Sequence, residues 1–228
     1  MKVFATLIQN LDSTNKTTQK LVAIERFLNE ASNEDKLWLL ALFTGKRPKR
    51  AVNTALLKQW VLEVTELPEW LFIESYAAVG DLGETIALLL PNNEQASNKS
   101  LAQWMNEIVA LKEQTDDQKK SYVLNSWNDL NTIERFIFNK LLGGSFRVGV
   151  SSKTLINALA KHYQIEATAV THAIMGDWKM NEVDFDGLVT GQFTEVNKSQ
   201  PYPFCLAYAL DKNLPDLGKR TDWQIEYK

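Results

Sequence analysis

The sequence predicts an all-α fold, with about ten helices in one domain over residues 1–195 and an extended tail over residues 196–228. Apolar residues recur roughly every three to four positions through most of the chain, which is the spacing of one helix face. Only ten glycines and six prolines interrupt the 228 residues, so long helices with short connections are expected. Three consecutive capping pairs support the prediction: Ser100 with Gln103, Thr115 with Gln118, and Asn131 with Glu134.

The N-terminal part of the chain is predicted to hold at least two helices. Residues 17–31 place their apolar side chains on one helical face. Ser32 with Asp35 resembles a capping box and starts a second helix, which should end near Gly45. Residues 1–16 fit either a strand-like tail or a helix.

The middle of the chain continues the helical pattern. Asn53 can cap a helix, and Pro68 suits the first turn of the next one. The turn Gly80-Asp-Leu-Gly83 lacks the strand before it and the lysine after it that a phosphate-binding P-loop needs. Its glycines are therefore interpreted as allowing close helix packing. Residues 91–99 form a polar loop.

Tryptophans are the side chains for which base stacking competes most directly with core packing. The chain holds seven of them. Four lie on apolar helical stripes, and we expect these four in the core: Trp60, Trp70, Trp104 and Trp127.

Between two helical patterns lies a glycine-rich basic stretch, residues 140–153. It contains three glycines and an arginine, and Ser151 or Ser152 can cap the helix that follows over roughly 152–163. The unpaired N–H groups at such a helix start suit an anion. Further helices are expected over 167–175 and around Phe185, and from Gln200 the prolines favour an extended chain.

Charge is concentrated in two islands. Residues 131–161 carry a net +4, and residues 46–50 carry another +4. Because the whole chain has a net charge of −3, the remaining residues sum to −11. Two basic islands on an acidic body predict a localised contact with a polyanion. Solvated lysines around an ordinary interhelical turn are the alternative interpretation.

The glycine-rich stretch also carries a family resemblance. The run Glu134-Arg-Phe-x-Phe-Asn-Lys-Leu141, a glycine pair, then Phe146-Arg-Val-Gly-Val-Ser151 and an Ala-Leu-Ala helix resemble the N-terminal DNA-binding domain of ATP-dependent DNA ligases, in its bacterial version. The run Gly45-Lys-Arg-Pro-Lys-Arg50 and the turn at Gly80–Gly83 are similar to that domain as well. The resemblance implies a loop and helix that lie along the minor groove near a nick.

Specific roles follow from the resemblance. Arg147 would enter or border the minor groove, and the remaining positions would contact phosphates through backbone or side chain. These positions are Lys46, Arg47, Lys49, Arg50, Gly143, Gly144, Ser145, Gly149, Ser151, Ser152 and Lys153.

The last residues, Asp222-Trp-Gln-Ile-Glu-Tyr-Lys228, resemble the strand that leads into the first nucleotidyltransferase motif of these ligases. Lys228 matches the lysine that ATP adenylates, and Glu226 matches an acidic residue that helps read adenine. ATP and Mg²⁺ would be cofactors of the whole enzyme only. We expect this chain to bind no cofactor and to be catalytically inactive by itself.

Other site types find no support in the sequence. His162 and His172 lack partners at metal-ligand spacing, so no metal site is predicted. Cys205 is the single cysteine, which excludes a disulfide framework and favours a reducing compartment. No apolar run is long enough to span a bilayer. A monomeric cytoplasmic protein, associated with the nucleoid, is therefore expected.

The predicted function is sequence-independent binding of nicked duplex DNA, as part of a ligase that seals 5′-phosphate to 3′-hydroxyl ends in DNA repair and whose catalytic domains are its partners. A helical module that binds an acidic protein partner through the same islands is the alternative. RNA binding is a third possibility, without an aromatic strand or loop motif to support it. Duplex binding requires both basic islands on one face.

Overall fold

The computed structural model describes residues 1–94, 96–144, 146, 149–176 and 178–192, and every regular element among them is helical. The all-α prediction is therefore confirmed. α1 settles residues 1–16 as largely helical. The described α-helices are α1 (Lys2–Asp12), α2 (Thr17–Glu30), α3 (Asn33–Phe43), α4 (Thr54–Thr65), α5 (Glu69–Val79), α6 (Leu82–Leu89), α7 (Leu101–Ala110), α8 (Asp116–Asp129), α9 (Thr132–Gly143), α10 (Ser152–Tyr163), α11 (Ala167–Met175) and α12 (Phe185–Val189), and a 3-10 turn covers Leu111–Glu113.

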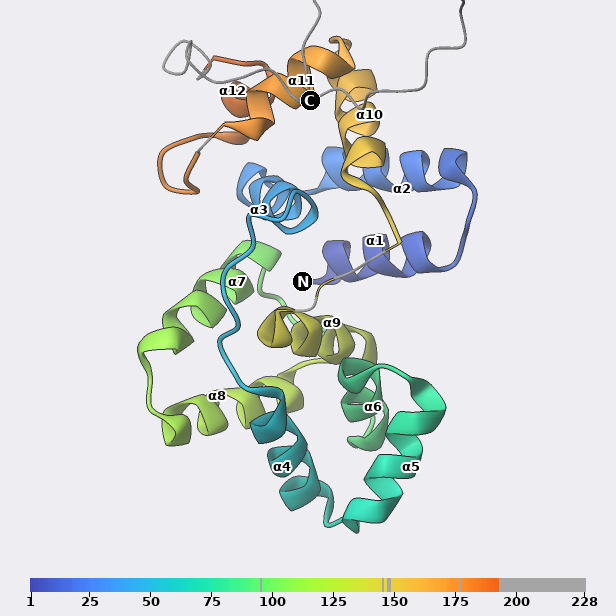
Figure 1. Cartoon of the computed structure of the whole chain (residues 1–228), viewed down its shortest axis with the longest axis vertical. Coiled ribbons are helices and arrows are strands. Elements are labelled where there is room, and N and C mark those ends of the chain that lie inside the picture. The colour runs from blue at the N-terminus through green and yellow to red at the C-terminus, as the bar shows by residue number, and fades with distance from the viewer. Residues whose placement is uncertain (95, 145, 147–148, 177, 193–228) are drawn as a thin grey trace, which may run out of the picture.

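The helices form two groups (Figure 1). One group contains α2, α3 and α10–α12, and the other contains α4–α9. α1 joins them, because it packs against α2 on one side and α9 on the other. The chain also passes between the groups through residues 44–53 and again through residues 144–151. The first crossing contains the basic island at residues 46–50, and the second lies within the island at residues 131–161.

Capping explains most helix starts. Ser100 and Thr115 make full capping boxes with Gln103 and Gln118, as predicted. Asn131 accepts a hydrogen bond from the Glu134 N–H at 3.0 Å, which confirms that helix start too.

Two acidic residues of the predicted capping pairs point elsewhere. The Glu134 carboxylate accepts a hydrogen bond from the Ser97 N–H at 3.0 Å, and the Asp35 carboxylate accepts one from the Ala102 N–H at 2.8 Å. Both side chains are buried. They tie α9 and α3 to the start of α7, and this was not predicted because the partners lie far away in the sequence.

The core bears out three of the four tryptophan predictions. Trp60, Trp104 and Trp127 are buried, but Trp70 on α5 is 65% exposed, so its prediction was wrong. In α5 the buried side chain is Phe72, and the side of the helix that carries Trp70 faces solvent. The predicted close packing is confirmed at Gly83, since a Cβ there would lie 3.3 Å from the Asn139 Cβ. It was wrong for Gly80, where a Cβ would meet nothing within 4 Å and the φ of +79° is what favours glycine.

Residues 193–228 lie outside the described part of the chain. The predicted domain boundary at residue 195 and the extended tail after it therefore stay predictions.

Candidate nucleic-acid interface

The two basic crossings lie side by side. The Arg47 Nη1 donates a hydrogen bond to the Phe146 carbonyl at 3.1 Å, and the Arg50 Nε donates one to the Gly143 carbonyl at 3.2 Å. Each contact joins residues more than ninety positions apart in the sequence. We call the surface formed by residues 46–50 and the described residues of 143–153 the basic seam. The first island thus lies against the segment that contains Lys153 of the second island, which is part of the condition that duplex binding requires.

Gly144 allows this close approach, and Gly143 supplies one of the hydrogen-bond acceptors. Gly144 follows α9 with a φ of +65°, a left-handed conformation that favours glycine. A Cβ on Gly144 would lie 3.5 Å from the Arg50 Cα, so the two backbones nearly touch there. Gly143 is buried inside the last turn of α9, and its carbonyl is the acceptor for Arg50. Gly144 therefore lets the two crossings pack together and Gly143 accepts the hydrogen bond from Arg50, while the predicted contact of both glycines with phosphates stays a prediction.

Phe146 anchors the second crossing. Its ring is 6% exposed and stacks on Phe4 at a centroid distance of 5.7 Å. On another side it meets Phe43 edge-on at 5.9 Å. A side chain in the middle of a basic loop thus belongs to the core that joins α1 and α3. The sequence signal was a single aromatic residue between polar neighbours, and we did not select it as a functional residue.

The start of α10 keeps backbone donors available. The Ser151 hydroxyl accepts a hydrogen bond from the Thr154 N–H at 3.2 Å, and the Ser152 hydroxyl donates to the Phe43 carbonyl at 2.9 Å. Both predicted hydroxyls are thus engaged inside the protein. Among the described residues, the N–H groups of Ser152 and Lys153 have no hydrogen-bond partner, and such groups at a helix start suit an anion.

The cations of the basic seam differ in how they are held. Arg47, Lys49, Arg50 and Lys153 are exposed. Lys46 is half-buried, donates to the Gly176 carbonyl at 2.5 Å and lies 5.1 Å from the centre of the Trp178 ring. Among the described residues, Lys49 and Lys153 make no ion pair.

One further cation was missed in the sequence. Lys20 on α2 donates a hydrogen bond to the carbonyl of Gly149, so a third segment contributes positive charge to the basic seam. No local motif marks Lys20, because its partner lies 129 residues away.

Some predicted residues cannot be placed. Ser145 and Arg147 of the loop, and Glu226 and Lys228 near the C-terminus, lie outside the described residues. Within the described part, no group of three or more His, Cys, Asp and Glu side chains is arranged to hold a metal ion. No helix there is both long and apolar enough to cross a membrane.

Comparison with known proteins gives consistent matches. The family described as DNA ligase N terminus matches residues 1–160. A DNA ligase of Thermococcus fumicolans is 26% identical over 185 residues, which cover 75% of this chain and 33% of that ligase. A DNA ligase of Thermococcus onnurineus is 27% identical over 183 residues, covering 74% and 33%. A DNA ligase of Methanosphaera stadtmanae is 24% identical over 115 residues, covering 47% and 21%. The matches span at most a third of the length of these ligases.

Proposed function

The chain belongs to the family of DNA ligase N-terminal domains, and from that premise we propose that it binds duplex DNA at a nick, whatever the base sequence. The observation that carries the proposal is the contact between the two crossings, in which Arg47 donates to the Phe146 carbonyl at 3.1 Å. It joins two cationic segments into one surface. A duplex, with its closely spaced phosphates, is the polyanion that suits such a surface.

The proposed contacts divide by chemistry. Lys49 and Lys153 contact phosphates as exposed point charges. Arg47 and Arg50 each use one donor on a backbone carbonyl, and their other N–H groups remain for phosphate oxygens. The N–H groups at the start of α10 bind one more phosphate. Arg147 borders the minor groove, a role that rests on the family resemblance.

We further propose that the chain works within an ATP-dependent ligase of the bacterial branch, in DNA repair, together with that ligase's catalytic domains. Lys228 as the adenylated lysine and Glu226 as an adenine contact rest on the resemblance, as do ATP and Mg²⁺ for the whole enzyme. A monomer in the cytoplasm, near the nucleoid, completes this proposal.

Binding of an acidic protein partner is the competing function. The side-by-side crossings support the choice of a duplex, because Lys20 and Arg47 bring positive charge from two other segments against residues 146–149. Competition between poly-glutamate and a nicked duplex for the same protein separates the two functions.

The test is fluorescence anisotropy of a labelled nicked duplex titrated with the chain over a salt series. Lys49→Ala and Lys153→Ala should each weaken binding equally for all duplex sequences and lower the slope of log affinity against log salt by about one. Lys112→Ala, which removes an exposed lysine beyond the basic seam, is the matched control and should leave the slope unchanged. Equal slopes for all three variants would contradict the proposal.

A further inference from the structure

The helix α5 turns an apolar face toward solvent. Trp70 is 65% exposed and Ile73 is 49% exposed, while Phe72 on the opposite side is 2% exposed. At about 100° per residue, Trp70, Ile73 and Ala77 share one face of the helix, and Ala77 is exposed as well. Tryptophan is usually among the largely buried residue types, and contiguous exposed apolar side chains mark interaction sites.

The surroundings of this face are acidic. Between Lys58 and Lys99 the chain has no lysine or arginine but seven acidic residues. Glu66, just before α5, and Glu74, on its exposed side, both face solvent. Among the described residues, neither of them forms an ion pair. Glu66 and Glu74 thus border the apolar face with negative charge that no described cation neutralises. Three other acidic residues of the stretch are paired with lysines, namely Glu63, Glu69 and Asp81.

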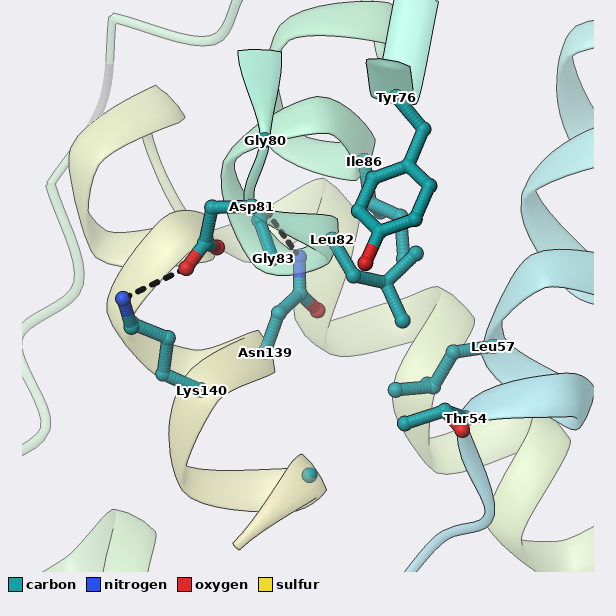
Figure 2. Close-up of a pocket in the computed structure, with 11 residues that line it drawn as sticks. Thr54, Leu57, Tyr76, Gly80, Asp81, Leu82, Gly83, Ile86, Asn139 and Lys140 are labelled. Atoms are coloured by element: carbon teal, nitrogen blue, oxygen red, sulfur yellow. Dashed lines mark hydrogen bonds and ion pairs between the residues drawn. The ribbon is translucent and has the colours of Figure 1, made fainter. Parts of the chain in front are cut away.

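A cavity of about 270 Å³ lies at the C-terminal end of α5 (Figure 2). Tyr76 forms one wall, and its ring points toward Leu82 and Leu57. Asp81 adds a carboxylate, which lies 2.7 Å from the Lys140 Nζ. Pockets for small molecules usually have roughly 300–1,000 Å³. This cavity is therefore better matched to a single side chain of a docked segment than to a whole small molecule.

We propose that the α5 face, made of Trp70, Ile73, Glu74 and Ala77, docks a segment of a partner protein that carries lysine or arginine beside an apolar anchor. The exposed aromatic and aliphatic side chains supply the contact area, and tryptophan and tyrosine are the residues that dominate such contacts. The cavity beside Tyr76 receives the anchor, and Glu66 and Glu74 attract the cations.

The negative charge of Glu66 and Glu74 favours a cationic protein segment over other partners. The acidic border repels phosphate groups, so neither DNA nor an anionic lipid surface fits the α5 face. A second copy of the chain would have to present its basic seam, which the proposed function assigns to DNA. A separate cationic protein segment meets the charge requirement on α5, and only the cavity that receives its anchor borders the seam, at Gly143.

The experiment uses a fluorescein-labelled amphipathic peptide of about 16 residues, with leucine at helical spacing, one tryptophan, and lysine elsewhere. Anisotropy titrations should show binding that weakens as salt is added. Trp70→Ala should weaken binding about tenfold or more, and the double variant Glu66→Gln with Glu74→Gln should weaken it several-fold. All three substituted positions are exposed, so the variants should keep the wild-type unfolding midpoint.

Two controls fix the interpretation. Val22→Ala removes another exposed apolar side chain, on α2, and should not change binding of the peptide. A peptide with glutamate in place of lysine should not bind to the α5 face, so Trp70→Ala should not alter its signal. The proposal is overturned if the lysine peptide does not bind at low salt, if Trp70→Ala binds it as wild type does, or if sedimentation shows that Trp70→Ala abolishes self-association of the chain.

Discussion

The basic seam and the α5 face are both exposed surfaces, but different parts of the molecule hold them in place. The basic seam joins segments that lie far apart in the sequence, through Arg47, Arg50 and the buried ring of Phe146. The α5 face comes from a single helix of eleven residues. The residues of the seam are therefore brought together by contacts between distant segments, whereas the residues of the α5 face already lie together on one helix. Substitutions should therefore affect stability and binding together at the seam and separately at α5.

The largest effect should come from Phe146→Ala. Removal of this buried ring leaves a cavity between Phe4 and Phe43, so we expect the free energy of unfolding to fall by about 3 kcal/mol. DNA affinity should fall as well, because the second crossing loses its anchor. Urea denaturation followed by circular dichroism measures the first effect, and anisotropy with a nicked duplex measures the second.

Trp70→Ala is the matched comparison, since it also removes a large aromatic ring. Its exposed position predicts a change of less than about 0.5 kcal/mol in unfolding free energy. If Trp70→Ala lowered the free energy of unfolding as much as Phe146→Ala does, the proposed difference between the seam and the α5 face would be wrong.

The next effect concerns how Arg50 acts. Lysine keeps the positive charge but cannot reproduce the planar guanidinium that bonds the Gly143 carbonyl while it faces outward. If Arg50 positions the end of α9, Arg50→Lys should weaken binding of nicked DNA about tenfold, close to 1.4 kcal/mol. The salt slope should stay near that of wild type, because the charge is kept. Anisotropy over the salt series gives both quantities.

Lys49→Arg is the control for charge-conserving exchange in the same segment. Lys49 makes no ion pair among the described residues, so this exchange should leave affinity nearly unchanged. Arg50→Lys with wild-type affinity would show that Arg50 contributes charge alone.

Local sequence patterns were enough to predict most of the fold. The capping pairs at Ser100 and Thr115 and the apolar spacing fixed where helices begin, because these signals act over three or four residues. The orientation of α5 was not predictable in this way. Its stripe contains apolar residues on two sides, and tertiary packing, including that against α6, decides that Phe72 turns inward and Trp70 outward.

The residues of the candidate site could be predicted from the sequence, but the contacts that bring them together could not. Charge clustering located both basic islands, and the resemblance connected them with DNA. Their contact depends on backbone carbonyls at Gly143 and Phe146, and every residue has a carbonyl, so no sequence pattern marks it. Lys20 and the anchoring role of Phe146 were not predicted either, because their partners are distant in the sequence.

The smallest expected effect distinguishes an ion-paired acidic residue, Asp81, from an exposed one, Glu74, both in the stretch between Lys58 and Lys99. Burial alone would raise the pKa of Asp81, but hydrogen bonds from Lys140 and from the Glu84 N–H outweigh burial and hold that pKa below its ordinary value. The resulting stabilisation is complete above the ordinary carboxyl pKa of about 3.9 and is lost as pH falls through the lowered pKa of the folded protein.

Asp81→Asn keeps a good helix cap but removes the charge, so it should cost about 1 kcal/mol of unfolding free energy at pH 7. The difference from wild type should begin to shrink as pH falls below the ordinary carboxyl pKa of about 3.9, and it should vanish once pH is below the lowered pKa of Asp81 in the folded protein. Glu74→Gln, at an exposed position, should show neither effect. Urea denaturation at several pH values measures both variants. A cost of Asp81→Asn that stays constant with pH would mean that the Asp81–Lys140 contact stabilises the protein through shape and not through charge.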